Sequence, residues 1–264
     1  RGIGSTLGLG DMLEFGIPPI MTADGPAGLR VVSYNEYGFP DVYTTTWPCE
    51  TLLACTWNTD LVRDVTKHGA MEFKENGIGI WLAPGMNIHR APLCGRNFEY
   101  FSEDPLITGE MGAAYVSGVQ SQKIAATPKH FACNNKEYNR LDADSIVSER
   151  ALREIYLKGF EICVKKSDPW FLMTSYNIVN GVHSSENYDL ITGILRGEWG
   201  FSGAVTTDWC THGTHANETK AGNDLKMPEG YPESFRQDIN TGKITRSDIE
   251  ICVKRILELI LRLE

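Results

Sequence analysis

Residues 200–209 combine a predicted buried strand with a carboxylate and an indole at its end. The β-branched residues 205–207 suit an extended, pleated backbone, and Asp208 and Trp209 follow them directly. In parallel α/β barrels, catalytic groups stand at the carboxyl ends of the strands. The indole adds an apolar face on which a pyranose ring can stack. Because many strand-end aspartates only cap the next helix, Asp208 needs support from the rest of the chain.

That support comes from polar and large side chains that follow other predicted strands. If the strands are parallel, their carboxyl ends converge on one mouth of a barrel. The residues expected there, together with Asp208 and Trp209, are Asp24, Arg96, Lys129, His130, Arg140, Met173 and Tyr176.

Each of these residues also has a simpler structural explanation. Asp24 precedes Gly-Pro, a tripeptide that turn chemistry alone explains. Arg96 and Glu99 can form a structural ion pair, and we assign Glu99 that role. Lys129 and His130 could be ordinary rim residues, and Arg140 could serve salt bridges within its loop. Met173 and Tyr176 could be core residues of one strand, although their spacing of three would put them on opposite faces of it.

Short apolar segments alternate with amphipathic ones along the chain. The predicted strands are 19–22, 51–55, 78–83, 124–130, 171–176, 204–208 and 224–227, and the predicted helices are 60–76, 105–122, 148–166, 188–199, 232–241 and 245–263. Asn58 or Thr59 can cap the first helix, and Asp104-Pro105 can open the second. This alternation predicts right-handed crossovers and a parallel sheet, as in a TIM-barrel-like (β/α)₈ domain with irregular or missing first units. A dinucleotide fold is disfavoured because no Gly-x-Gly-x-x-Gly follows a strand.

Composition, net charge and cysteine content limit the partners and the cellular location that the protein can have. The 264 residues carry a net charge of −9 without a long basic run, which argues against nucleic acid or an anionic membrane as partner. No apolar run approaches the roughly 20 residues that a membrane-spanning helix needs. Seven cysteines without a Cys-x-x-Cys pair indicate reduced thiols and a cytoplasmic protein. The start at Arg1 is not a signal peptide, and we expect a piece of a longer polypeptide.

The motifs from residues 23–30 to residues 221–228 together resemble glycoside hydrolase family 3, the retaining β-glucosidases. The resemblance spans nearly the whole chain. It implies a catalytic barrel over residues 1–264, a nucleophile role for Asp208 and a subsite for one terminal, non-reducing glucose. A retaining glycosidase needs one ionised carboxylate to attack the anomeric carbon and one acid about 5 Å away.

The residue types fit the roles that the resemblance implies. Asp24 can accept hydrogen bonds from two sugar hydroxyls, O4 and O6, while Arg96, Lys129 and His130 donate to ring hydroxyls. Tyr176 can restrain the nucleophile, and Met173 can form an apolar wall. No metal or other cofactor is required.

The general acid/base of such enzymes is not visible in this chain. In the family it is usually a Glu in a separate α/β sandwich domain, which we expect elsewhere in the gene product or on another chain. The chain alone is therefore expected to bind sugar weakly and to hydrolyse ordinary glucosides poorly.

Several other functions stay open at this point. The same scaffold supports β-xylosidase or α-L-arabinofuranosidase activity, and a non-catalytic sugar-binding barrel would also lack the acid. An N-acetylhexosaminidase is disfavoured, since the His-Asp loop of that branch is absent after His130. An aldolase would need a Schiff-base lysine or a phosphate-binding glycine loop. Cys210, His212 and His215 could ligate a metal, but they fit no common zinc spacing.

Overall fold

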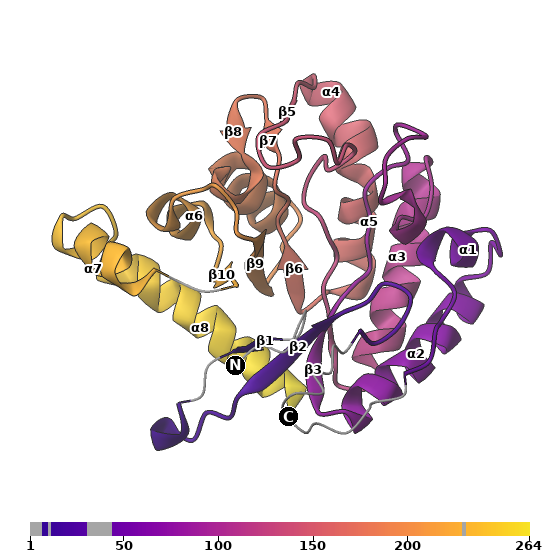
Figure 1. The fold of residues 1–264 in the computed structure, drawn as a ribbon, viewed down its shortest axis with the longest axis horizontal. Coiled ribbons are helices and arrows are strands. Elements are labelled where there is room, and N and C mark those ends of the chain that lie inside the picture. The colour runs from indigo at the N-terminus through magenta and orange to yellow at the C-terminus, as the bar shows by residue number, and fades with distance from the viewer. Residues whose placement is uncertain (1–6, 10–11, 31–43, 229–230) are drawn as a thin grey trace, which may run out of the picture.

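The computed structural model describes residues 7–9, 12–30, 44–228 and 231–264, without the side chains of 7–9 (Figure 1). Its centre is a curved array of parallel strands in the order β2-β3-β4-β6-β9-β10. A parallel bridge between Phe131 and Thr174 joins β4 to β6. The strands are β1 (Leu7–Leu9), which runs antiparallel to β2, β2 (Ile20–Asp24), β3 (Ile78–Leu82), β4 (Ala125–Ala126), β6 (Phe171–Met173), β9 (Ala204–Trp209) and β10 (Leu225–Met227). This arrangement is TIM-barrel-like, as predicted.

Helices cover the outside of the strands and begin where the sequence offers caps. Asn58 accepts hydrogen bonds from the first turn of α2, and Asp104 does so for α3, with Pro105 at its first position. Thr245 and Asp248 form a capping box at α8. The helices are α1 (Glu50–Ala54), α2 (Thr59–Glu75), α3 (Pro105–Gln120), α4 (Glu149–Ala151), the π-helical η4 (Leu152–Tyr156), α5 (Lys158–Ser167), the π-helical η6 (Asp189–Glu198), α6 (His215–Ala221), α7 (Pro232–Asn240) and α8 (Arg246–Leu263).

The predicted strand at residues 51–55 is wrong, because this segment forms helix α1. Leu53 and Ala54 are buried while Leu52 is exposed, as on a helix that lies on the surface. The Thr51 hydroxyl donates to the Asn97 and Tyr100 carbonyls and anchors this helix beside the 3₁₀ turn η3 (Asn97–Glu99). A short apolar run does not distinguish a strand from a buried helix, and here the tertiary contacts decide.

Besides β1 and the short 3₁₀ turns, two groups of elements were not predicted. One is helix α6, which follows the nucleophile candidate. The other is a small sheet of two-residue strands, β5 (Asp144–Ser145), β7 (Ile178–Val179) and β8 (Val182–His183), in the order β5-β7-β8. Strands this short have no measurable alternation of apolar and polar residues.

The core has two layers, one on each side of the strands. Between strands and helices, Phe73 stacks on Trp81 with ring centroids 4.2 Å apart, and Tyr115 meets Trp81 edge-on. Inside the barrel, residues from β2, β3, β6 and β9 pack against Leu259 and Ile260 of α8. Among the described residues no pairing joins β10 to β1 or β2, and α8 crosses this side of the barrel (Figure 1).

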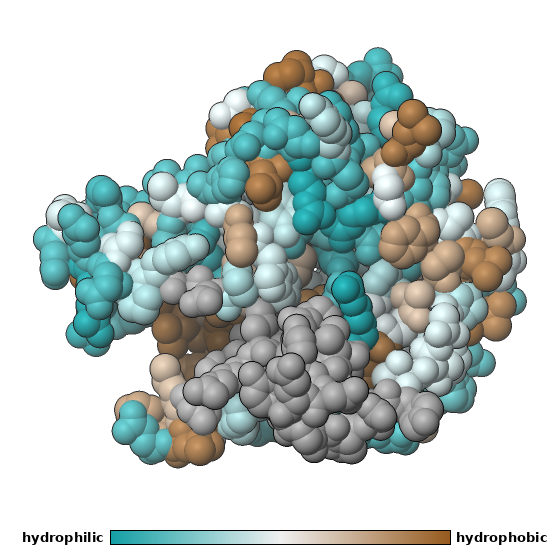
Figure 2. Space-filling view, viewed as in Figure 1, coloured by the Kyte–Doolittle hydropathy of each residue, from teal (hydrophilic) through white to brown (hydrophobic). Residues whose placement is uncertain are grey.

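The outer surface is mixed. The face in Figure 2 is mostly hydrophilic, with hydrophobic side chains in separate small patches. Within the described ranges, no helix has both the length and the apolar character to cross a membrane. Four cysteines are buried and all seven are free thiols.

Candidate active site

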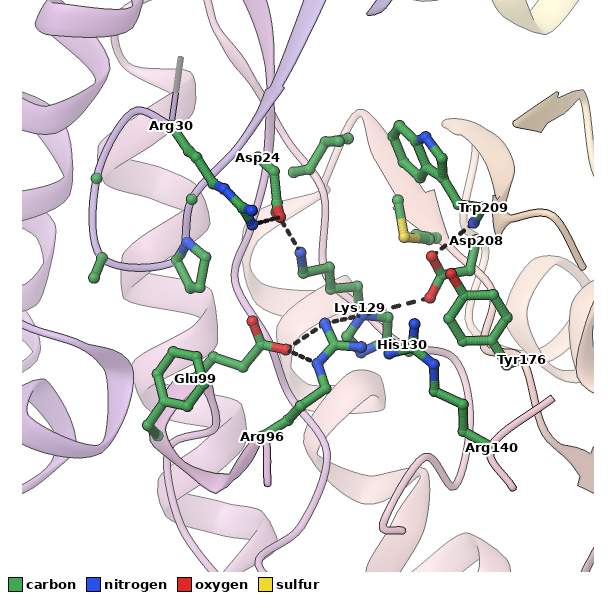
Figure 3. A pocket seen from close by; sticks show the side chains of 17 residues that line it. Asp24, Arg30, Arg96, Glu99, Lys129, His130, Arg140, Tyr176, Asp208 and Trp209 are labelled. Atoms are coloured by element: carbon green, nitrogen blue, oxygen red, sulfur yellow. Dashed lines mark hydrogen bonds and ion pairs between the residues drawn. The ribbon is translucent and has the colours of Figure 1, made fainter. Parts of the chain in front are cut away.

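A cavity of about 690 Å³ opens at the carboxyl ends of the parallel strands. All nine residues predicted to form the site line it, and Figure 3 shows eight of them labelled around one space. Asp24 ends β2, Lys129 and His130 follow β4, Met173 ends β6, and Asp208 with Trp209 ends β9. Residues separated by up to 185 positions in the chain therefore meet because the strands are parallel.

A tight turn presents Asp24 to the cavity. Gly25 has φ +133°, and a Cβ there would collide with the carbonyl of Gly28. The Arg30 N–H donates to the Asp24 carbonyl at 3.0 Å, which closes the loop back on the strand end. Trp81 Nε1 donates to the Gly25 carbonyl at 2.9 Å and ties the turn to β3. The Asp-Gly-Pro turn chemistry and the site role of Asp24 are therefore compatible.

Asp24 and Lys129 form an ion pair at the base of the cavity. Lys129 Nζ donates to Asp24 Oδ1 at 2.8 Å, and Arg30 Nη1 lies 3.8 Å from Asp24 Oδ2. Burial by itself would raise the pKa of Asp24, but the charge and hydrogen bond of Lys129 bring it below its usual value. Burial would likewise lower the pKa of Lys129, and the Asp24 carboxylate reverses this shift. Both groups are thus charged, and Asp24 keeps acceptor capacity toward the cavity.

His130 is a neutral imidazole whose ring nitrogens contact three neighbouring side chains. Burial, followed by the charges of Arg96 and Lys129, lowers its pKa well below the ordinary value. Arg96 Nη2 donates to Nε2 at 2.8 Å, so the ring proton resides on Nδ1. Nδ1 lies 3.3 Å from the Tyr100 hydroxyl and 3.4 Å from Asn87 Oδ1. The prediction that His130 donates toward the sugar therefore does not fit its Nε2 atom, which is an acceptor here.

Asp208 is buried with one carboxylate oxygen free of hydrogen bonds. Oδ1 accepts the Trp209 N–H at 2.7 Å, while Oδ2 has no hydrogen-bond partner within the described site and lies 3.7 Å from His130 Nε2. Burial raises the pKa of Asp208, and the charge of Arg96, the Trp209 N–H, Lys129 and Tyr176 oppose this rise. A carboxylate with a free oxygen beside a cavity is suited to attack an electrophilic carbon.

The remaining predicted residues form the wall around Asp208. The Tyr176 hydroxyl lies next to the Asp208 carboxylate (Figure 3), and burial and this negative charge raise the pKa of Tyr176. The Arg140 guanidinium lies 4.6 Å from the centre of the Tyr176 ring. Met173 and Tyr176 both line the cavity, so their predicted placement on opposite faces is wrong. Strand β6 ends at Met173, and its alternation does not extend to Tyr176.

Sequence reasoning missed further residues at the cavity. Arg30, Phe98 and Glu99 also line it. Glu99 accepts from Arg96 Nε, as expected of a structural ion pair, but it also faces the cavity. Arg30 could have been predicted at the cavity from its position just after the Asp24 turn, since a chain that turns back at Gly28 returns to the end of the strand.

The residues considered as metal ligands are engaged elsewhere or dispersed. His212 Nδ1 pairs with Asp142 at 2.8 Å, and the His215 ring packs on Phe235 with centroids 4.3 Å apart. Cys210 is exposed. In the described part of the chain, no three His, Cys, Asp or Glu side chains are grouped as a metal ion would require.

Comparison with known families identifies the scaffold. The family model for the glycosyl hydrolase family 3 N terminal domain matches residues 16–259. The chain belongs to this family. The family predicted from the sequence motifs is thus confirmed, together with its TIM-barrel-like fold.

Relatives within family 3 are close in sequence and structure. Beta-glucosidase A of Butyrivibrio fibrisolvens is 54% identical over 249 residues, which are 94% of this chain and 29% of that protein. An exo-alpha-(1->6)-L-arabinopyranosidase of Bifidobacterium breve is 41% identical over 250 residues, 93% of this chain and 33% of that protein. The structure of beta-glucosidase 3B from Thermotoga neapolitana in complex with alpha-D-glucose has a TM-score of 0.95 and 45% identity, over 99% of this chain and 38% of that one. The chain thus spans about a third of the length of these family 3 proteins.

Proposed function

We propose that this barrel is the glycone-binding and nucleophile-bearing domain of a retaining, exo-acting β-glucosidase. Asp208 attacks the anomeric carbon of a terminal β-D-glucosyl residue and forms a covalent glycosyl-enzyme intermediate. The observation that carries the proposal is the free Oδ2 of Asp208, which lies in a cavity lined by charged donors. The 54% identity to a protein named beta-glucosidase A supports glucose as the sugar.

The cavity offers complementary partners to the hydroxyl groups of one sugar ring. Asp24 accepts, while Lys129, Arg96 and Arg140 donate. Trp209 and Met173 give the ring apolar surfaces, and Tyr176 restrains Asp208. Hydrogen bonds that strengthen as the oxocarbenium-like transition state develops would contribute several kcal/mol to catalysis.

The general acid/base lies outside this chain in our proposal. Among the described residues, the other carboxylates that line the cavity are Asp24 and Glu99, which are engaged with Lys129 and Arg96. An α/β sandwich domain, in the same gene product or on another chain, would supply the acid as a Glu. The greater length of the matched relatives is consistent with such a second domain.

The cytoplasmic location expected from the cysteines stays a prediction, which fractionation of the source cell tests.

A mechanism-based label tests the nucleophile. A 2-deoxy-2-fluoro-β-glucoside with a dinitrophenolate leaving group needs no acid to depart, so labelling does not depend on the missing domain. Peptide mass mapping should place the fluoroglucosyl group on Asp208, and Asp208→Asn should not be labelled. A label on another residue of the wild-type protein would refute this assignment.

A second sugar specificity has one specific observation in its favour. A relative at 41% identity is named an exo-alpha-(1->6)-L-arabinopyranosidase. Relatives of this chain are therefore named for activity on a pentose as well as on glucose. A panel of nitrophenyl β-glucoside, β-xyloside and α-L-arabinosides, assayed with the complete polypeptide, decides between them. We expect the glucoside to have the highest kcat/KM, and a preference for a pentoside would replace the glucosidase assignment.

A further inference from the structure

Glu137 lies behind the cavity wall and connects two of its parts. It is not among the residues that line the cavity, and its side chain is 21% exposed. Its Oε1 accepts from Asn134 Nδ2 at 3.1 Å, and its Oε2 accepts from Arg140 Nη1 at 3.1 Å. Each carboxylate oxygen therefore holds a different donor.

The Asn134 side of this carboxylate is rigid. Asn134 Nδ2 also lies 3.1 Å from the Tyr100 hydroxyl, which in turn is 3.3 Å from His130 Nδ1. Asn134, Tyr100 and His130 are all buried. Glu137 is thus anchored, through hydrogen bonds between packed side chains, to the imidazole beside Asp208.

The Arg140 side chain is more exposed than the Glu137 side chain. The Arg140 side chain is 41% exposed, and a long arginine side chain loses considerable rotamer freedom when it is held in one place. Two contacts restrain it, the face of the Tyr176 ring and the Glu137 carboxylate. Both place the guanidinium on the Asp208 side of the cavity, near the neutral His130 (Figure 3).

We infer that Glu137 is a positioning residue that fixes the Arg140 guanidinium against Tyr176 for contact with the bound sugar. This role rests on the proposed function, because it takes Arg140 as a sugar-binding group. The Glu137–Arg140 pair is partly exposed, at 21% and 41% of its side chains, and ion pairs near the surface contribute little to folding. The effect of Glu137 therefore falls on sugar binding, where a misplaced donor is costly.

Variants at Glu137 separate its two hydrogen bonds. Glu137→Gln has one acceptor oxygen and one NH₂ donor group, so it can satisfy Asn134 or Arg140 but not both. Glu137→Ala loses both contacts. With the fluoroglucoside label, we expect the half-saturating concentration to rise about tenfold in Glu137→Ala and less in Glu137→Gln, while the maximal labelling rate falls no more than about threefold. The control is Glu154→Ala, which breaks an exposed pair with Arg150 away from the cavity and should change nothing.

A double-mutant cycle tests whether Glu137 acts through Arg140. In an Arg140→Ala background, Glu137→Ala should cause no further loss beyond about twofold. A full additional loss in that background would overturn the inference. So would a crystal structure of Glu137→Ala in which the Arg140 guanidinium still lies over the Tyr176 ring. Absence of any label on wild-type Asp208 would instead reject the proposed function, and the crystal structure would still judge the positioning role by itself.

Discussion

Removal of the Asp24 carboxylate should destabilise the protein through the lysine that it leaves behind. Lys129 is only 3% exposed in its side chain, and its ammonium group lies 2.8 Å from Asp24 Oδ1. Breaking a buried ion pair costs about 3–5 kcal/mol because one charge stays buried without compensation. The Asp24 side chain is 26% exposed, so we expect Asp24→Ala to cost about 3 kcal/mol, at the lower end of that range. For a domain of this size the melting temperature should fall by roughly 6–12 °C.

The pH dependence of this loss has a definite sign. In the wild-type protein the pKa of Lys129 is raised, so the stabilisation is complete below the unfolded pKa of about 10.4 and is lost as pH rises through the folded pKa. In Asp24→Ala, burial should bring the pKa of Lys129 below the unfolded value. The unfolded state then binds more protons, and the free energy of unfolding of the variant should rise with pH toward 10.

Urea unfolding followed by circular dichroism measures both effects. The double variant Asp24→Ala/Lys129→Met removes the orphaned charge and should recover most of the loss. Glu250→Ala is the control, since its pair with Arg246 is exposed to solvent and should contribute little to stability. The reasoning fails if Asp24→Ala costs less than about 1 kcal/mol, or if the double variant is as unstable as the single one.

Three further substitutions test other parts of the structure. Asp208→Asn should abolish labelling by the fluoroglucoside. It should also raise the free energy of unfolding by about 0.5–2 kcal/mol in urea melts, because burial raises the pKa of this carboxyl and its charge therefore destabilises the folded state. A lower free energy of unfolding in the variant would contradict this. Lys226→Met should cost about 3–5 kcal/mol in thermal melts, since Glu218, paired with it at 2.6 Å, is 1% exposed; a change below about 1 kcal/mol would show that Glu218 finds other compensation. Gly118→Ala should cost about 1–3 kcal/mol, because a Cβ there collides with the Thr66 hydroxyl between α2 and α3, and unaltered melting would disprove this close packing.

Sequence reasoning predicted the barrel because the long elements carry strong local signals. Helices α2 and α3 begin at the caps predicted from the sequence, and the side chains of these caps make the expected hydrogen bonds. The site residues could be grouped because parallel strands bring their carboxyl ends together. The predicted strand at residues 51–55 was wrong because helix α1 is anchored by hydrogen bonds from Thr51 to residues 46 and 49 positions away, which no local sequence pattern contains.

The electrostatic details of the site could not be predicted in the same way. That His130 accepts rather than donates at Nε2 depends on the direction of the Arg96 side chain. That Glu137 contacts both Asn134 and Arg140 depends on how the loop after β4 folds back on itself. Such facts arise from distances between side chains, and residue order alone does not fix them.

The neutral ring of His130, with its unprotonated Nε2, lies between two opposite charges, the Arg96 guanidinium and the Asp208 carboxylate. No ion pair joins Arg96 to Asp208 in the described site, although the guanidinium charge opposes the rise in the pKa of Asp208 that burial causes. A direct fork between the two would place an N–H on each carboxylate oxygen, so Oδ2 would no longer be free of hydrogen bonds. The imidazole thus lets the positive charge of Arg96 act on Asp208 while Oδ2 keeps no hydrogen bond.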